Sequence, residues 1–160
     1  MEESLSREEM PETADRDQAD FLTLYKERFG LKKTDPGMYS PLVLAYIGDA
    51  VYELMIRTKI VNGGNAQVNK LHRRSAALVK AETQARLIHA LEPFLTEEEA
   101  SVYRRGRNAK SMTVAKHATM TDYRRATGLE ALIGWLFLSE RFDRLAELTA
   151  MGLKEIGELT

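Results

Sequence analysis

The chain has 160 residues, of which 44% are hydrophobic and 29% are charged, with four prolines and no cysteine. This composition is typical of one globular domain, and it excludes a disordered, a collagen-like or a disulfide-stapled protein. Without thiolates, and with three scattered histidines, the sequence predicts no zinc site. The acidic first residues are unlike a signal peptide, and no apolar run reaches the roughly 18 residues of a membrane span. We therefore expect a cytoplasmic protein.

The net charge of −1 conceals an uneven distribution of charge along the chain. Residues 1–20 carry eight acidic side chains against two arginines, whereas the rest carries 21 basic and 16 acidic side chains. Residues 1–18 also lack apolar periodicity, so we expect an acidic, disordered extension there and a single folded domain over 19–160. A modestly basic folded body is compatible with an RNA partner, although such an asymmetry is common.

The first predicted elements follow from apolar periodicity and from helix-end residues. A short helix is expected over residues 21–29, followed by a turn over 34–37. Ser40-Pro41 is a helix start, because serine caps free amides and proline at the first helical position loses no hydrogen bond. We expect that helix to reach about Val61, before the glycine-rich stop at residues 62–65.

The remaining periodic segments also predict helices, and no segment shows the two-residue alternation of a strand. The fold class is therefore all-α, a helical bundle. A loop is expected from Gly106 to Met120. The predicted helices cover 66–74, 75–92, a segment from the Thr96 capping box to about Arg105, a segment capped by Thr121 or Asp122 that reaches Ser139, and 141–156.

Two of these predicted helices are almost entirely apolar, yet each holds isolated carboxylates. Residues 41–56 contain only Asp49 and Glu53 as charged side chains, and residues 126–138 contain only Glu130. A helix that is apolar nearly all round should be buried on most sides. Burying an ionised carboxylate costs several kcal/mol unless it is paired or binds a metal ion.

Glycines beside the acids suggest how the two helices meet. Gly48 precedes Asp49, and Gly134 follows Glu130 by one turn, so the two helix backbones can approach closely. Two carboxylates brought together in this way repel each other, and a Mg²⁺ ion between them removes the repulsion while accepting hard oxygen ligands. We therefore predict a divalent metal site at Asp49 and Glu130.

Simpler explanations of the acids stay open at this point. Asp49 and Glu130 could instead be satisfied by arginines or by helix-end amides. Glu53 lies four residues before Arg57 and can form an ordinary ion pair with it on one face of the helix.

The segment from Ser101 to Arg125 has the strongest charge bias in the sequence, with seven basic residues against the single acid Asp122. Because Gly106 and the polar run 108–113 interrupt helicity, part of this cluster should form an exposed loop that contacts phosphates. The alternative is a solvated face that aids solubility. The residues that we expect to bind substrate are Arg104, Arg105, Arg107 and Lys110.

Three segments of the chain resemble ribonuclease III, and most closely the Mini-ribonuclease III family of short bacterial enzymes. Their order and spacing over residues 40–138 make the combined resemblance specific. Tyr46-Ile47-Gly48-Asp49-Ala50-Val51 resembles the first helix signature, Glu130-Ala131-Leu132-Ile133-Gly134 resembles the second, and Arg104-Arg105-Gly106-Arg107-Asn108-Ala109-Lys110-Ser111 resembles a segment typical of the Mini branch.

The resemblance implies a ribonuclease III endonuclease-domain bundle and a metal-dependent endoribonuclease that cleaves double-stranded RNA as a homodimer. It also implies maturation of precursor 23S ribosomal RNA, with a ribosomal protein as helper. Asp49 and Glu130 would be the catalytic residues and would hold Mg²⁺, or Mn²⁺ in its place, and hydrolysis would leave 5′-phosphate ends. Larger relatives carry a separate domain that binds double-stranded RNA. We expect none here, so the catalytic body itself should hold the substrate.

The chain departs from the larger enzymes at three positions. Leu42 and Ala45 stand where they have glutamates, and Thr127 stands where they have an aspartate. Mini-type relatives share this reduced acidic set, which keeps Asp49 and Glu130. The departures leave open a catalytically inactive RNA- or ribosome-binding protein on the same fold. A helical protein-interaction module without an RNA role is a third alternative, but it leaves the paired signatures unexplained.

Overall fold

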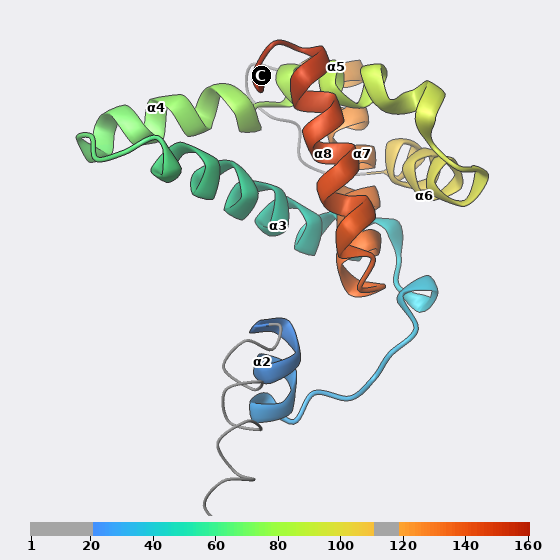
Figure 1. The fold of residues 1–160 in the computed structure, drawn as a ribbon. Helices are drawn as coiled ribbons and strands as arrows, with labels where there is room; N and C mark the ends of the chain where they lie inside the picture. The colour runs from blue at the N-terminus through green and yellow to red at the C-terminus, as the bar shows by residue number, and fades with distance from the viewer. Residues whose placement is uncertain (1–20, 111–118) are drawn as a thin grey trace, which may run out of the picture. The chain divides into compact units, whose positions relative to one another are not determined.

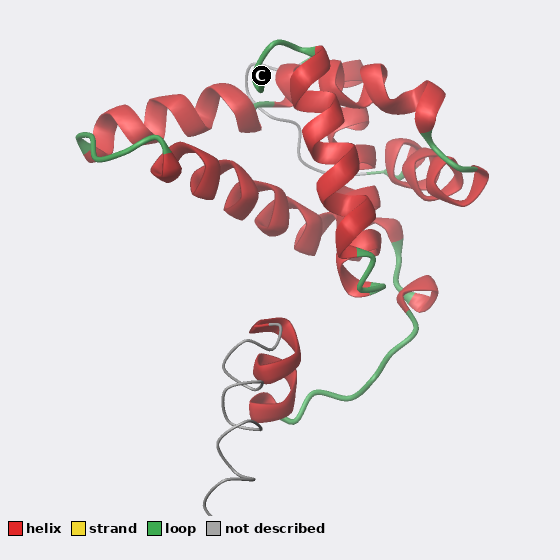
Figure 2. Ribbon diagram, viewed as in Figure 1, coloured by secondary structure: helices red, strands yellow, loops and turns green. Residues whose placement is uncertain are grey.

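The computed structural model describes residues 21–110 and 119–160 (Figure 1). They belong to two compact units, one ending at Thr34 and the other beginning at Asp35. All secondary structure in these residues is helical, which confirms the predicted all-α fold class (Figure 2). Among them no helix combines the length and the apolar character that a membrane span requires. The acidic extension expected over 1–18, and the domain boundary after it, lie outside the described residues.

The first unit contains the helix α2 (Phe21–Phe29), with the bounds that the sequence predicts. Aromatic rings four residues apart lie along it, with centroids 6.2 Å apart for Phe21 and Tyr25 and 4.3 Å apart for Tyr25 and Phe29. Gly30 follows with a φ of 61°, a left-handed conformation that ends the helix.

The second unit begins with a short 3₁₀ helix, η1 (Pro36–Met38), and continues into a long helix, α3 (Pro41–Asn62). The start of α3 is as predicted, since the Ser40 hydroxyl accepts a hydrogen bond from the Val43 amide at 3.3 Å. The other elements of this unit are α4 (Val68–Val79), α5 (Ala81–Leu91), η2 (Glu92–Phe94), α6 (Glu97–Asn108), α7 (Met120–Leu138) and α8 (Phe142–Glu155).

The division between α4 and α5 lies later than the sequence predicted. The predicted helix ended at residue 74, whereas α4 continues to Val79. The alanine-rich sequence contains no helix-stopping residue near 74, so α4 continues to where side chains of α5 bind its last carbonyls. Thr83 donates to the Ala77 carbonyl at 2.6 Å, and Gln84 donates to that of Val79 at 2.7 Å.

The predicted capping box at the start of α6 is present and is tied to α8. Thr96 and Glu99 exchange the two reciprocal hydrogen bonds of that motif, at 3.2 and 2.9 Å. Glu99, which is only 2% exposed, also accepts two hydrogen bonds from the Arg144 guanidinium, both at 2.8 Å. These bonds to Arg144 hold the pKa of the Glu99 carboxyl below its usual value. The pair therefore fixes α6 against α8.

The predicted loop after Arg105 begins later than expected, because α6 runs to Asn108 and includes Gly106. A side chain at Gly106 would approach the Ala131 Cβ to 2.7 Å. The glycine thus allows α6 to pack closely on α7 instead of ending the helix. Residues 111–118 of the predicted loop lie outside the described residues. After them Thr119, and not Thr121 or Asp122, caps α7.

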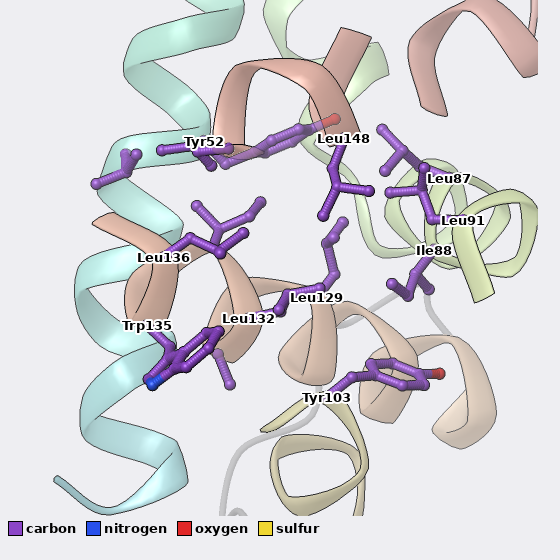
Figure 3. Packing of buried hydrophobic residues seen from close by; sticks show 14 of the residues in the cluster. Tyr52, Leu87, Ile88, Leu91, Tyr103, Leu129, Leu132, Trp135, Leu136 and Leu148 are labelled. Carbon is purple, nitrogen blue, oxygen red and sulfur yellow. The ribbon is translucent and has the colours of Figure 1, made fainter. Parts of the chain in front are cut away.

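Helix α7 is the centre of the second unit and packs against α3, α5, α6 and α8. Figure 3 shows the apolar core around it, in which Tyr52, Leu132 and Leu136 are almost completely buried. The crossing of α3 and α7 is a contact between backbones. A Cβ at Gly48 would overlap the Glu130 carbonyl oxygen, and a Cβ at Gly134 would overlap that of Leu44. The close approach predicted from the two glycines is confirmed.

The prediction that α3 is buried on most sides is wrong. The face of α3 that packs on α7 is buried, but in the described part of the chain the other face is exposed to solvent. We call this exposed face the α3 stripe, and its residues are Leu42 (39% exposed), Val43 (47%), Tyr46 (82%), Ala50 and Leu54 (65%). Steps of three and four residues place them on one side of the helix.

The backbone contact predicts a large stability effect at Gly134. Gly134→Ala forces α3 and α7 apart, and we expect the free energy of unfolding to fall by about 3 kcal/mol. Urea denaturation monitored by circular dichroism measures this. Gly63→Ala is the matched control, because Gly63 has an ordinary helical φ of −74° and should change stability by less than about 1 kcal/mol. Equal losses in the two variants would contradict the proposed contact.

Candidate active site

The structure brings the two acids of the apolar helices together. Asp49 on α3 follows Gly48, the residue that contacts the backbone at Glu130 on α7. The side chains of Asp49 and Glu130 form a hydrogen bond with each other. Asp49 is exposed, whereas Glu130 is partly buried. One carboxyl group of the pair is thus open to solvent, and the other is held inside the helix crossing.

The surroundings of Glu130 favour its neutral form. Burial, the hydrogen bond with Asp49 and the negative charge of Asp49 together raise the pKa of its carboxyl group from an ordinary 4.5 to about 9, and burial has the largest effect. Near neutral pH and without a cation, Glu130 therefore keeps its proton. The pair then carries one negative charge where two ionised carboxylates would carry two.

The donor set at this crossing fits a hard divalent cation that keeps several water ligands. Two carboxyl groups offer oxygen ligands, and a cation in place of the Glu130 proton would remove the repulsion between them. Within residues 21–110 and 119–160, no group of three or more acidic or histidine side chains could hold a metal ion. Glu53, one turn after Asp49, is engaged by Arg57 at 2.7 Å, as its spacing predicted.

The three departures from the larger enzymes add no acid to the site. Leu42 lies on the α3 stripe, and Ala45 is buried. The Thr127 hydroxyl donates to the Tyr123 carbonyl at 3.0 Å, within its own helix. Asp49 and Glu130 therefore form the pair without further carboxyl groups from these positions.

The predicted substrate-binding residues lie at the end of α6 and just after it. Arg104, Arg105 and Lys110 are exposed, while Arg107 is partly buried. The Arg107 guanidinium lies 5.6 Å from the centre of the Tyr103 ring, and its Nε donates to Asn108 at 3.2 Å. Arg104, Arg105 and Arg107 thus lie on α6, and Lys110 follows it. The role of these four residues in binding substrate stays a prediction.

A cavity that the sequence analysis missed lies between the end of α6 and the start of α7. It has a volume of about 290 Å³. Arg124 and Arg125 belong to the basic segment from Ser101 to Arg125. They are far from Arg107 in the sequence, so the sequence does not indicate that the three side chains line one cavity. Its lining residues are Glu92, Arg107, Asn108, Thr121, Arg124 and Arg125.

Known proteins resemble the chain over most of its length. The family model described as the ribonuclease III domain matches residues 42–141. A protein from Clostridium tetani, named Mini-ribonuclease 3, is 50% identical over 117 residues, which are 72% of this chain and 78% of the relative. The protein of the same name from Enterococcus faecalis is 49% identical over 119 residues, which are 73% and 90% of the two chains.

A solved structure shares the fold as well. A crystal structure of a Fusobacterium nucleatum protein superimposes with a TM-score of 0.67 and 30% sequence identity, over 76% of this chain and 96% of that protein. The family match contains both acids of the pair and the basic end of α6. The chain therefore belongs to the ribonuclease III family, in its Mini-ribonuclease III branch, and is an endoribonuclease.

Proposed function

We propose that this endoribonuclease cleaves double-stranded RNA in a Mg²⁺-dependent reaction, as a homodimer, and that precursor 23S ribosomal RNA is its substrate. The observation that carries the proposal is the meeting of the Asp49 and Glu130 carboxyl groups where α3 crosses α7. The pair holds a proton that a divalent cation would replace, and one of its two members is exposed to solvent. These are the properties of a metal site that an RNA strand can reach.

In the proposed reaction the two acids have different tasks. Asp49 is exposed and would hold the cation through its carboxylate, while Glu130, which is partly buried, would hold it after losing its proton. With Mg²⁺ bound by these residues, or Mn²⁺ in its place, the site would have an activated water and a positive charge to stabilise the leaving 3′ oxygen. The rigid backbone contact at Gly48 fixes the distance between the two acids. Hydrolysis leaves 5′-phosphate and 3′-hydroxyl ends.

The basic end of α6 supports a duplex RNA substrate. Arg104, Arg105 and Lys110 are exposed, and none of them takes part in an ion pair among the described residues. Free cations of this kind bind backbone phosphates without regard to base sequence. Double-stranded RNA is recognised mainly by the shape of its backbone and shallow groove, which suits such a surface.

The α3 stripe supports a homodimer. Monomeric proteins rarely leave a run of large apolar side chains in water, and this stripe includes Tyr46, 82% exposed, and Leu54, 65% exposed. A two-fold axis would place the stripe against the same stripe of a second copy, so that each subunit covers the other. Because Asp49 lies beside the stripe on α3, the two metal sites would lie on the same side of the dimer. They could then act on opposite strands of one duplex.

The specific substrate and the helper protein follow from the resemblance to the family. Precursor 23S ribosomal RNA contains paired segments, and a ribosomal protein bound to that RNA would present them to the enzyme. A cytoplasmic location, where ribosomal RNA matures in bacteria, is part of the same proposal.

Removing the Asp49 carboxylate should abolish cleavage. We expect Asp49→Asn to fold normally and to leave both a long RNA duplex and precursor 23S ribosomal RNA intact, because the cation loses its exposed ligand. Gel electrophoresis of the products, with Mg²⁺ and with a chelator, measures this. Glu53→Gln is the matched control and should keep its activity, since Arg57 already engages that carboxylate. An active Asp49→Asn enzyme would refute the metal site.

The raised pKa of Glu130 predicts a pH-dependent stability of the metal-free protein. In the unfolded chain this carboxyl ionises above its ordinary value of 4.5, whereas in the folded chain it stays protonated up to about 9. The unfolded state therefore binds fewer protons, and stability is lost as the pH rises through that window. Glu130→Gln has no such proton, so its Tm should exceed that of the wild type increasingly from about pH 5 to about pH 9.

Thermal unfolding in a chelator, at a series of pH values, tests this difference between the two proteins. Mg²⁺ should reduce it, because the cation replaces the proton in the wild type and finds one ligand fewer in Glu130→Gln. A difference in Tm that does not vary with pH would show that Glu130 titrates normally.

A charge in the α3 stripe should separate the subunits. We expect Leu54→Lys to sediment as a monomer in analytical ultracentrifugation and to lose cleavage of both strands, because lysine cannot be buried in an apolar contact. Phe94→Lys is the matched control, since Phe94 is also exposed (53%) but lies on η2. Dissociation by Phe94→Lys, or a dimeric Leu54→Lys, would place the interface elsewhere.

A further inference from the structure

The cavity between α6 and α7 has an excess of positive charge. Three guanidinium groups line it, those of Arg107, Arg124 and Arg125, against the single carboxylate of Glu92. The Thr121 hydroxyl and the Asn108 amide add uncharged hydrogen-bond donors. We call it the arginine cavity. Its lining is suited to an oxyanion, because guanidinium groups bind phosphate oxygens through two parallel hydrogen bonds.

Among residues 21–110 and 119–160, the guanidinium groups of the arginine cavity form no ion pair. Other arginines of the second unit are paired, such as Arg57 with Glu53 and Arg144 with Glu99. No ion pair of the described residues includes a residue that lines the cavity. Arg107 and Arg125 are nevertheless partly buried. Partly burying cations that a single carboxylate opposes is unfavourable, and a bound anion would compensate for the excess of positive charge.

A buried hydroxyl group, that of Tyr103, lies next to the cavity and interacts with the Glu92 carboxylate. Tyr103 is 2% exposed, and its hydroxyl makes no hydrogen bond of ordinary geometry within the described part of the chain. Burial raises its pKa, the nearby Glu92 carboxylate raises it further, and the Arg107 charge lowers it. In Figure 3 the hydroxyl points away from Leu132 in the core. The Tyr103 hydroxyl thus lies beside two residues of the cavity lining, Glu92 and Arg107.

The arginine cavity is separate from the acid pair. Arg125 precedes Glu130 by five residues on α7, which places the two side chains about 140° apart around the helix axis. Glu130 faces Asp49 on α3, whereas the cavity is lined by residues of α6, η2 and the start of α7. A phosphate in the cavity would therefore not be the phosphate that reacts at the acid pair of the same subunit.

We propose that the arginine cavity is a second phosphate-binding site, which holds a phosphate group of the RNA away from the bond that is cut. This inference rests on the proposed RNA substrate and adds a subsite to it. The phosphate could belong to the interior of a duplex strand or to the 5′ end that an earlier cut has produced. Glu92 lowers the net positive charge of the cavity and so weakens phosphate binding, which allows the product to leave.

Binding measurements without cleavage test the subsite. Fluorescence anisotropy in a chelator gives the affinity of the whole chain for an RNA duplex. We expect Arg124→Gln to weaken binding about threefold, and Arg124→Gln with Arg125→Gln about tenfold or more, with a shallower dependence on salt. Glu92→Gln should bind about threefold tighter. Arg86→Gln, which removes an exposed arginine of α5 outside the cavity, should change the affinity less than twofold.

Two further binding measurements distinguish the possible outcomes. Duplexes with 5′-phosphate and with 5′-hydroxyl ends distinguish the sources: a loss confined to the first identifies a terminal phosphate, and an equal loss identifies an interior one. Calorimetric titration with inorganic phosphate tests the cavity without RNA, and the wild type and Arg86→Gln should bind where the double variant does not. Thermal unfolding confirms that each variant is folded.

The results that overturn the subsite differ from those that overturn the proposed function. If the folded double variant binds duplex and inorganic phosphate as Arg86→Gln does, the cavity is not a phosphate site, whatever the enzyme cleaves. If the wild type binds inorganic phosphate in the cavity but no duplex RNA, the proposed substrate is wrong and the anion site stands. Weaker duplex binding by Glu92→Gln would contradict the role given to that carboxylate.

Discussion

The backbone contact between α3 and α7 is the constraint on which the rest of the structure depends. Gly48 and Gly134 each leave out a side chain at a point where any Cβ would overlap a carbonyl oxygen of the other helix. The helices therefore cross more closely than side-chain packing normally allows, at a propensity cost of about 1 kcal/mol per glycine. The core around Leu132 and Leu136 stabilises that crossing. A catalytic constellation needs such rigid support, because small displacements of the reacting groups lower activity strongly.

The same crossing creates an electrostatic conflict that gives the site its chemistry. Asp49 and Glu130 come from two apolar helices, and neither is engaged by an arginine in the described structure, in contrast to Glu53 and Glu99. The fold resolves the conflict by keeping Glu130 protonated, at the expense of stability at high pH. Strained or destabilised groups of this kind are concentrated at functional sites. The pair that we propose as the metal site thus lowers the folding stability of the metal-free protein at high pH.

Three features of the second unit are incomplete in a single chain without ligands. The acid pair has an excess of negative charge, the arginine cavity has an excess of positive charge, and the α3 stripe has an excess of apolar surface. Each excess matches one component of the proposed enzyme, namely a divalent cation, an RNA phosphate and a second subunit. Because the three excesses differ in kind, they can be tested separately, and the failure of one assignment leaves the other two intact.

The sequence by itself determined the helical class, most helix starts and the identity of the acid pair. The helix starts depend on local chemistry, as in the Ser40 cap and the Thr96 capping box. The acid pair is recognised from the rarity of charge in the two apolar helices and from motifs whose order and spacing are specific. Only the tertiary structure decided where α4 ends and that Gly106 lies inside a helix. It also decided that one side of α3 is exposed to solvent and that Arg125 lines the same cavity as Arg107. Those facts depend on contacts between residues far apart in the chain, and apolar periodicity cannot tell a face that packs on its own chain from one left open.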